Sequence, residues 1–328
     1  MHETDAKRVK PSGSTGKIVT VFGGSGFLGR HIVRALLKQG WRVRVAVRRP
    51  NQALFLKTAG AVGQLAIMPA NIRNEEACRT AIAGADAVIN LVGILHETGK
   101  QKFAALQNEG AARLARLAAE AGVKKFIQMS AIGADENSPS AYAKSKAEGE
   151  AAILEAIPQA VILRPSIVIG PEDDFFNRFA GMAQLSPALP LVGGGLTRYQ
   201  PVAVQDVVAA VMRVLEDTDC AGKTYELGGA GVYTFRELME LLLQVTQMRR
   251  LLVPLPFPVA GMIAQFAQFL PTPPLTPDQV LLLKSDNIVS PESQSAGLTL
   301  PGLGITPTPI EAVMPSYLSR FTGSHGKS

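Results

Sequence analysis

Three glycines spaced three residues apart, Gly23, Gly26 and Gly29, constrain this chain more than any other feature. They follow an apolar, β-rich run at Lys17–Gly23 and precede a segment with helical periodicity, His31–Lys38. Glycines at these positions permit a tight turn between a strand and a helix, and they let the two pack closely. They also let the backbone approach a ligand, which the free N–H groups of the helix would face. The pattern predicts a strand–turn–helix unit that binds phosphate.

Strands and helices continue to alternate through the first half of the chain. Strands are expected at Lys17–Gly23, Trp41–Val47, Gln64–Ala70, Ala85–Gly93, Lys124–Ser130 and Ala160–Gly170, and helices at His31–Lys38, Asn74–Ala83, Phe103–Ala121 and Ala141–Ile157. Such alternation is typical of βαβ units, in which the strands are parallel. The expected fold class is therefore α/β, with a doubly wound parallel sheet of the Rossmann type.

The pattern changes after Gly170, where prolines and glycines become frequent. Two helices remain clear, Gln205–Asp217 and Thr234–Gln247, and a capping box should open the second of them. We expect residues 17–170 to form the Rossmann domain and residues 171–320 a smaller α/β domain at the carboxyl edge of the sheet. The two could share part of the sheet. Residues 1–16 and 321–328 are expected to be flexible tails.

Composition excludes several classes of protein. With 47% apolar and 18% charged residues, the chain is unlike a disordered one. Its four histidines and two cysteines are scattered, so no metal site is expected. The net charge is +6, but no basic stripe is interleaved with aromatic residues, so we expect no nucleic-acid binding. Neither a signal peptide nor a transmembrane helix is indicated, which favours a reducing cytoplasm.

Two arginines follow the second predicted strand. Nineteen residues after Gly29, where an NAD-binding protein would place an acid on the ribose, this chain has Arg48 and Arg49. Guanidinium groups bind a 2′-phosphate through charge-assisted hydrogen bonds, so NADP(H) is preferred to NAD(H) as the cofactor. A solvated basic strand end is the alternative. Asn71 and Ile72, after the third strand, are candidates for contact with the adenine.

Tyr142 and Lys146 lie four residues apart, which places them on one face of a helix. An ammonium group beside a phenol lowers the pKa of the phenol, so Tyr142 is expected to act as an acid or base near neutral pH. Lys146 can also hold the nicotinamide ribose. Ser130 ends the fifth predicted strand, where its hydroxyl could bind a carbonyl oxygen. A surface helix that merely carries a tyrosine and a lysine is the alternative.

These motifs, with Asn90–Gly93 and Arg164–Ser166, resemble the extended or atypical branch of the short-chain dehydrogenase/reductase superfamily, which is close to the NAD-dependent epimerase/dehydratases. The resemblance implies Ser130, Tyr142 and Lys146 as catalytic residues. The cofactor-binding residues that it implies, together with the motifs above, are Gly23, Ser25, Gly26, Phe27, Leu28, Gly29, Arg48, Arg49, Asn71, Ile72, Leu91, Val92, Gly93, Tyr142, Lys146, Pro165 and Ile167.

Longer blocks narrow the resemblance to one subgroup. Val88–Leu95, Phe103–Asp135, Leu163–Ala180 and Tyr225–Leu243 are similar to the nucleotide-binding accessory subunits of respiratory complex I and their bacterial relatives. This resemblance implies a tightly held NADPH that serves structure and assembly rather than turnover. It also implies docking on peripheral-arm subunits of complex I. The expected location is peripheral, on the cytoplasmic face of a bacterial inner membrane.

An apolar segment near the C-terminus has no charged residue between Leu251 and Pro277. Its prolines leave room for one helix, Pro258–Leu270, which is too short to span a bilayer. This helix either completes the core of the small domain or forms a surface, within residues 251–275, that contacts a hydrophobic partner or the membrane interface.

Two enzymatic functions stay open. The first is a free NADP-dependent reductase of a quinone or an isoprenoid-like lipid precursor, with Tyr142 as the acid, Lys146 as its activator and Ser130 as the carbonyl-binding group. The second is a sugar-nucleotide epimerase or dehydratase. The apolar C-terminal segment fits poorly with the polar substrate of that second function.

Overall fold

A computed structural model describes residues 15–268, 270, 273 and 275–322 of the chain. Most of the two predicted tails, residues 1–14 and 323–328, lies outside the described residues. The strands are β1 (Ile18–Phe22), β2 (Arg42–Val47), β3 (Leu65–Pro69), β4 (Ala87–Asn90), β5 (Lys125–Met129), β6 (Val161–Pro165), β7 (Val168–Ile169), β8 (Ala188–Val192), β9 (Arg198–Tyr199), β10 (Val202–Ala203), β11 (Thr224–Leu227), β12 (Tyr233–Thr234) and β13 (Leu251–Leu255).

The α-helices are α1 (Phe27–Lys38), α2 (Glu75–Ile82), α3 (Glu109–Glu120), α4 (Ala141–Ala156), α5 (Phe175–Leu185), α6 (Val204–Glu216), α7 (Phe235–Thr246), α8 (Phe257–Ala267), α9 (Pro277–Leu282), α10 (Pro291–Ser295), α11 (Ile310–Val313) and α12 (Pro315–Leu318). The 3₁₀ segments are η1 (Pro50–Ala59), η3 (Gly193–Gly195), η4 (Pro301–Leu303) and η5 (Ser319–Phe321), and one π-helical turn is η2 (Ala104–Asn108).

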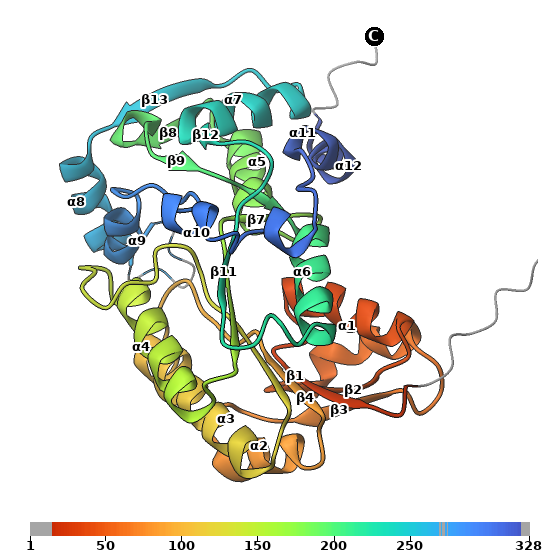
Figure 1. The fold of residues 1–328 in the computed structure, drawn as a ribbon. Coiled ribbons are helices and arrows are strands. Elements are labelled where there is room, and N and C mark those ends of the chain that lie inside the picture. The colour runs from red at the N-terminus through yellow and green to blue at the C-terminus, as the bar shows by residue number, and fades with distance from the viewer. Residues whose placement is uncertain (1–14, 269, 271–272, 274, 323–328) are drawn as a thin grey trace, which may run out of the picture.

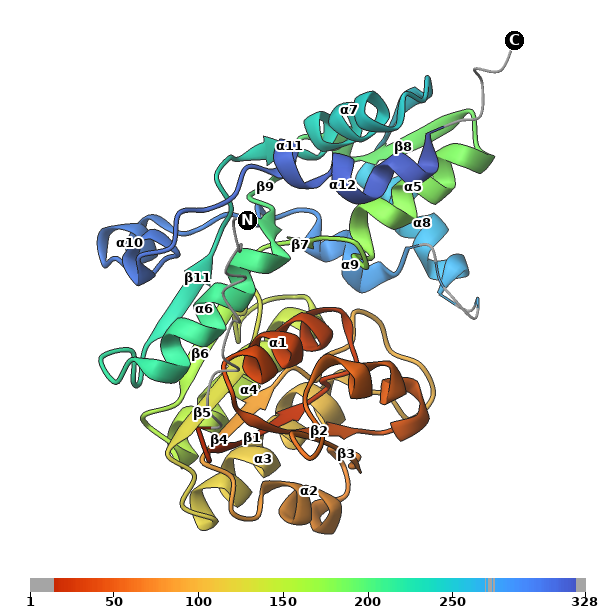
Figure 2. The same cartoon turned by 90° about the vertical axis from the view of Figure 1, so that its right-hand side faces the viewer.

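The central sheet has seven parallel strands in the order β11-β6-β5-β4-β1-β2-β3. The strand order reverses between β1 and β4, which makes the sheet doubly wound, as predicted. In α/β sheets of this kind, ligands bind at the carboxyl ends of the strands beside the reversal. Figure 1 shows α2, α3 and α4 on one side of the sheet and α1 and α6 on the other, and Figure 2 shows α1 and α6 above the sheet with α2 and α3 below it.

Alternating side chains of the strands supply two hydrophobic cores, one on each face of the sheet. Val19 and Val21 of β1 are fully buried against Ile32 and Val33 of α1 and against α6. Phe22 faces the other way, into the cluster formed with α2, α3 and α4. Both faces of the strands are therefore covered, which explains why the strand sequences are continuously apolar.

Segments after Gly170 contribute to this sheet and its helical layers. Strand β11 pairs with β6 at the edge of the sheet, and α6 packs on α1. Helices α5, α7, α11 and α12 lie beyond the carboxyl edge, around a third core (Figure 1). Leu300 and Leu303, at η4, instead pack into the core with α1 and α6. The chain thus crosses the carboxyl edge more than once, and the division at Gly170 stays a prediction.

Three local features differ from the sequence prediction. Helix α1 begins at Phe27 rather than His31, because Gly26 is already its N-cap. The helix expected over Phe103–Ala121 contains the π turn η2 before α3, a feature that often occurs near functional sites. Leu251–Leu255 forms a strand that pairs in parallel with β8 despite its proline.

Helix α8 ends at Ala267, three residues before the predicted end. In the segment between α8 and α9, residues 269, 271–272 and 274 lie outside the described residues. Within the described part of the chain, no helix combines the length and the apolar character needed to cross a membrane.

Candidate functional site

The glycine turn joins β1 to α1 beside the reversal of strand order. Gly23 has a φ of +78°, which favours glycine, and a Cβ there would lie 3.2 Å from the carbonyl carbon of Leu91. The Gly26 N–H donates to the Gly23 carbonyl over 3.0 Å. A Cβ on Gly29 would lie only 2.5 Å from the Gly23 oxygen. The glycine turn, the start of α1 and the loop after β4 therefore lie so close together that side chains at Gly23 and Gly29 would not fit.

Three guanidinium groups lie on the segments that follow this turn and β2. Arg48 and Arg49 are exposed directly after β2, which fits both a contact with a ribose phosphate and a solvated basic strand end. Arg30, which the sequence reading missed, stacks its guanidinium 4.9 Å from the ring centroid of Phe55 and pairs with Glu172 at 3.2 Å. Glu172 therefore compensates the charge of Arg30, and the exposed positive charge of this region lies on Arg48 and Arg49.

The residues expected to contact adenine point in different directions. Asn71 is half-buried, and its side-chain oxygen accepts from the Arg73 backbone N–H at 3.1 Å. Ile72 is buried in the core beneath α3, where it packs against Gly110. Asn71 therefore has the more accessible side chain, and Ile72 helps to set the shape of the loop.

The loop after β4 lies next to α4. Leu91 and Val92 are half-buried, and Asn90 accepts from the Val92 N–H at 3.1 Å while it donates to Gln128. A Cβ on Gly93 would lie 3.4 Å from Nζ of Lys146. Leu91–Gly93 thus runs between the glycine turn and the lysine.

The other predicted residues surround the same edge of the sheet. Ser25, Phe27 and Leu28 are half-buried at the start of α1. Pro165 ends β6 and accepts from the Ile132 N–H at 3.0 Å, while Ile167 packs against the third core. Apart from Tyr142 and Lys146 on α4, the predicted cofactor residues therefore lie at the carboxyl ends of β1, β2, β3, β4 and β6 or in the segments that follow them.

Tyr142 and Lys146, on α4, lie beside the end of β5, which Ser130 follows. Nζ of Lys146 lies 5.8 Å from the ring centroid of Tyr142 and donates to the Met129 carbonyl at 3.3 Å. Ser130 is buried, and its hydroxyl is the buried side-chain polar atom without a partner in the described structure. Buried hydroxyls are rarely unsatisfied, so this one is available to a ligand.

The expectation that Lys146 lowers the pKa of Tyr142 is wrong. Burial raises the pKa of the Tyr142 phenol to about 12, and the carboxylate of Asp278 raises it further. Burial also lowers the pKa of Lys146 to about 8, although Glu150 opposes this shift. The ammonium group faces the phenol ring rather than ion-pairing with a phenolate, so desolvation dominates both groups.

Asp278 was not predicted as a site residue. Its carboxylate, on α9, accepts from the Ser140 hydroxyl at 2.9 Å and from the backbone N–H groups of Ala141 and Tyr142 at 2.6 and 3.3 Å. It therefore caps the helix that carries Tyr142 and Lys146. A carboxylate followed by an apolar helix is a common sequence, and nothing in it marks a partner so distant along the chain.

Two amides also organise the site without a sequence signal. Gln107 in the π turn accepts from the Ser145 hydroxyl at 2.9 Å and donates to the Ile94 carbonyl at 2.7 Å, which ties α4 to the loop after β4. Asn287 donates to the Ile132 carbonyl at 3.1 Å and accepts from Ser166. Among the described residues, no group of three or more His, Cys, Asp or Glu side chains could hold a metal ion.

The sequence of this chain is similar to those of several known proteins. Residues 19–228 match the model of the NAD dependent epimerase/dehydratase family. The chain is 39% identical to "NADH dehydrogenase [ubiquinone] 1 alpha subcomplex subunit 9, mitochondrial" of Arabidopsis thaliana, over 85% of the chain and 72% of that protein. It is also 34% identical to a ceramide reductase of Caulobacter vibrioides, over 60% of each protein.

Solved structures show the same fold. A dTDP-glucose 4,6-dehydratase from Streptomyces venezuelae, solved with NAD and TYD bound, superposes with a TM-score of 0.71 over 93% of this chain and 96% of that one. Its sequence identity of 20% supports the fold alone. Given the family match and the similarity to the Arabidopsis subunit, the chain belongs to the NAD dependent epimerase/dehydratase family.

Proposed function

We propose that this protein is an NADP(H)-binding accessory subunit of respiratory complex I, in which the nucleotide serves structure and assembly. The observation that carries the proposal is the similarity to the Arabidopsis subunit, which spans most of both proteins. Its partners are the subunits of the peripheral arm of complex I.

The site favours holding a nucleotide over turning it over. An acid–base catalyst works best when its pKa is near the operating pH, whereas the pKa of Tyr142 is raised to about 12. The Asp278 carboxylate caps the start of α4 and opposes the formation of a tyrosinate at Tyr142. The cofactor would instead join the loops after β1, β2 and β4, and Lys146 would hold its ribose.

The surface of β13 and α8 supports a peripheral position at the membrane. Apolar side chains are exposed along both elements and just after α8: Leu251, Val253, Val259, Met262, Ile263, Phe266 and Leu270. We call this set the α8 surface. A surface of this kind suits a hydrophobic partner or the acyl–headgroup boundary of a bilayer. The net charge of +6 favours an anionic membrane, and we place the protein on the cytoplasmic face of a bacterial inner membrane.

A pair of variants tests the structural role of the nucleotide. Tyr142→Phe should leave NADH:quinone activity of the membranes at the wild-type level, because the proposed role needs no proton from the phenol. Gly26→Asp should lower the amount of assembled complex I several-fold, because a side chain there approaches the Gly23 oxygen and its charge repels the phosphates. Assembly is measured by native gel electrophoresis of membranes from complemented deletion strains. Loss of activity in Tyr142→Phe would contradict the structural role.

Replacing the two arginines after β2 tests the choice of nucleotide. Arg48→Ala, alone or with Arg49→Ala, should weaken NADPH binding about tenfold or more and leave NADH binding nearly unchanged, since only NADPH has the 2′-phosphate. The control is Arg42→Ala, which removes an exposed arginine from the opposite end of the same strand. Titration calorimetry measures both nucleotides, and equal losses for the two would refute the 2′-phosphate assignment.

A second candidate function is an NADP-dependent reductase of a lipid-like carbonyl compound. The similarity to ceramide reductase and the unpartnered hydroxyl of Ser130 favour it. Under this function Tyr142→Phe abolishes activity, so the experiment above separates the two candidates.

A further inference from the structure

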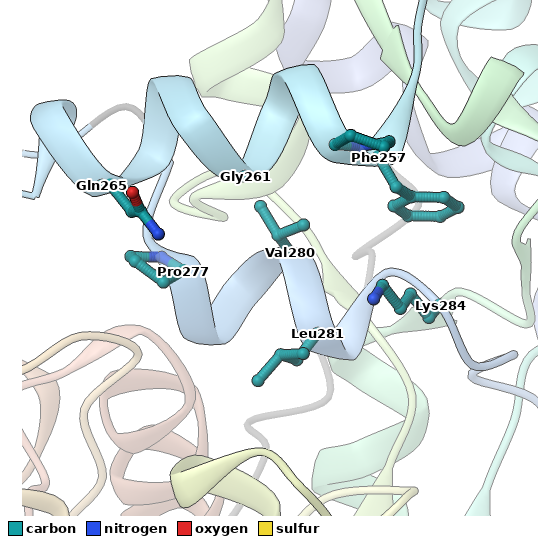
Figure 3. A pocket seen from close by; sticks show the side chains of 8 residues that line it. Phe257, Gly261, Gln265, Pro277, Val280, Leu281 and Lys284 are labelled. Atoms are coloured by element: carbon teal, nitrogen blue, oxygen red, sulfur yellow. The ribbon is translucent and has the colours of Figure 1, made fainter.

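An apolar groove runs between α8 and α9, away from the nucleotide site. It has a volume of about 360 Å³, within the usual range of small-molecule sites. Its lining residues are Phe257, Pro258, Gly261, Gln265, Pro277, Val280, Leu281 and Lys284. Figure 3 shows Val280 pointing from α9 toward α8, with Phe257 and Lys284 together at one end and Gln265 and Pro277 at the other.

Both walls of the groove are held in place by the rest of the protein. On its inner side, α8 packs Ala260 and Ala264 against Val280 of α9. Helix α9 is fixed in turn by Asp278, which binds the first turn of α4 through the hydrogen bonds described above. The groove is therefore formed without a ligand, which reduces the entropic cost of binding.

One end of the groove is positively charged. The Lys284 side chain is exposed, and its ammonium group lies 5.9 Å from the ring centroid of Phe257. Among the described residues it makes no ion pair, since the nearby Asp286 binds Arg198 at 2.7 Å and Asp278 binds α4. An apolar channel that ends at a cation matches a ligand with an apolar chain and an anionic head.

We propose that the α8–α9 groove binds an acyl chain of one anionic phospholipid, with the lipid phosphate at Lys284. The proposal rests on the membrane contact in the proposed function. Helix α8 carries both Gly261 and Gln265 of the groove and Met262 of the α8 surface, so a chain could enter the groove from the bilayer while the head group stays at the interface. The small volume excludes a protein helix as the occupant of the groove itself.

Gly261 gives a direct test, because a Cβ on it would meet no atom within 4 Å. Gly261→Leu should therefore fill the groove without disturbing the backbone. The matched control is Gly181→Leu, on α5, where a Cβ also meets no atom within 4 Å. The probes are dioctanoyl phosphatidylglycerol and dioctanoyl phosphatidylcholine below their micelle concentrations, and calorimetry measures their binding to the purified full chain.

We expect the wild type and Gly181→Leu to bind one phosphatidylglycerol per chain, about fivefold more tightly than phosphatidylcholine, and Gly261→Leu to lose this binding. Lys284→Gln should bind both lipids equally. Equal binding by the two glycine variants, no binding by the wild type, or equal affinity for glycerol phosphate would overturn the proposal. Because the lipids are monomeric, this result is independent of complex I assembly, so failure of the groove leaves the subunit proposal to its own test.

Discussion

Gly29→Ala is expected to weaken nucleotide binding at least a hundredfold and to destabilise the fold by about 2 kcal/mol. The added methyl group would lie 2.5 Å from the Gly23 oxygen and 2.6 Å from the Gly24 backbone. Relief requires α1 to move away from the turn, and this removes its N-terminal N–H groups from the phosphates. Calorimetric titration with NADPH and urea unfolding measure the two effects.

Gly181→Ala is the control for the same chemical change inside a helix. At this position a Cβ meets no atom within 4 Å, so alanine should stabilise the protein by up to ~1 kcal/mol through its higher helix propensity. The two variants thus have effects of opposite sign. If Gly29→Ala bound NADPH as tightly as the wild type, the turn could not be the phosphate site.

Lys146→Met is expected to abolish a gain of about 3 kcal/mol in the free energy of unfolding, which the nucleotide-free wild type shows as the pH rises. The unfolded chain keeps the Lys146 proton up to the ordinary pKa of 10.5, whereas the folded protein releases it near pH 8. Unfolding therefore takes up a proton between these values, and the wild type gains stability as the pH rises through this window. Methionine lacks the titrating group, so the variant lacks this gain.

Urea unfolding of the wild type and Lys146→Met at several pH values from 7 to 11 gives the difference between their free energies of unfolding. Other groups titrate in both proteins and cancel in the comparison. The Met129 carbonyl keeps a partner in the variant, because Gln128 also donates to it at 2.9 Å, so the substitution leaves no unsatisfied acceptor. Parallel stability curves for the two proteins would show that Lys146 is not desolvated.

Much of the fold follows from local sequence. The bounds of β1, β2, β3 and β5 agree with the prediction to within one residue at each end, because strands covered on both faces are apolar throughout. Strands β4 and β6 end earlier than predicted, at Asn90 and Pro165, because the apolar sequence continues into the segments after them. The glycine turn was predicted because its spacing suits a tight turn and close packing of strand and helix, and the close approach of Gly29 to the Gly23 oxygen agrees with this. The Thr234 capping box is likewise formed as predicted.

The parts that sequence reasoning missed depend on contacts between distant segments. The pKa of Tyr142 depends on burial and on Asp278, which reaches α4 from another part of the chain. The π turn η2 lies against α4, where a Cβ on Gly149 would overlap the Gln107 carbonyl. Strand β13 exists because β8 offers it a partner. None of these contacts has a periodic signal in the sequence.

Under the proposed function, the residue pattern of a dehydrogenase serves to hold a nucleotide rather than to turn it over. Lys146 lies beside Tyr142 and contacts the end of β5, yet burial and Asp278 disfavour the tyrosinate that turnover would need. The proposal assigns these residues to the ribose of the nucleotide, whose binding would stabilise the assembly.

The most direct test of the central claim is to isolate the tagged protein from gently solubilised native membranes and to identify its partners and bound nucleotide by mass spectrometry. We expect complex I subunits in near-equal amounts, together with NADPH. Recovery of the protein alone, without complex I subunits, would contradict the account and would favour the reductase.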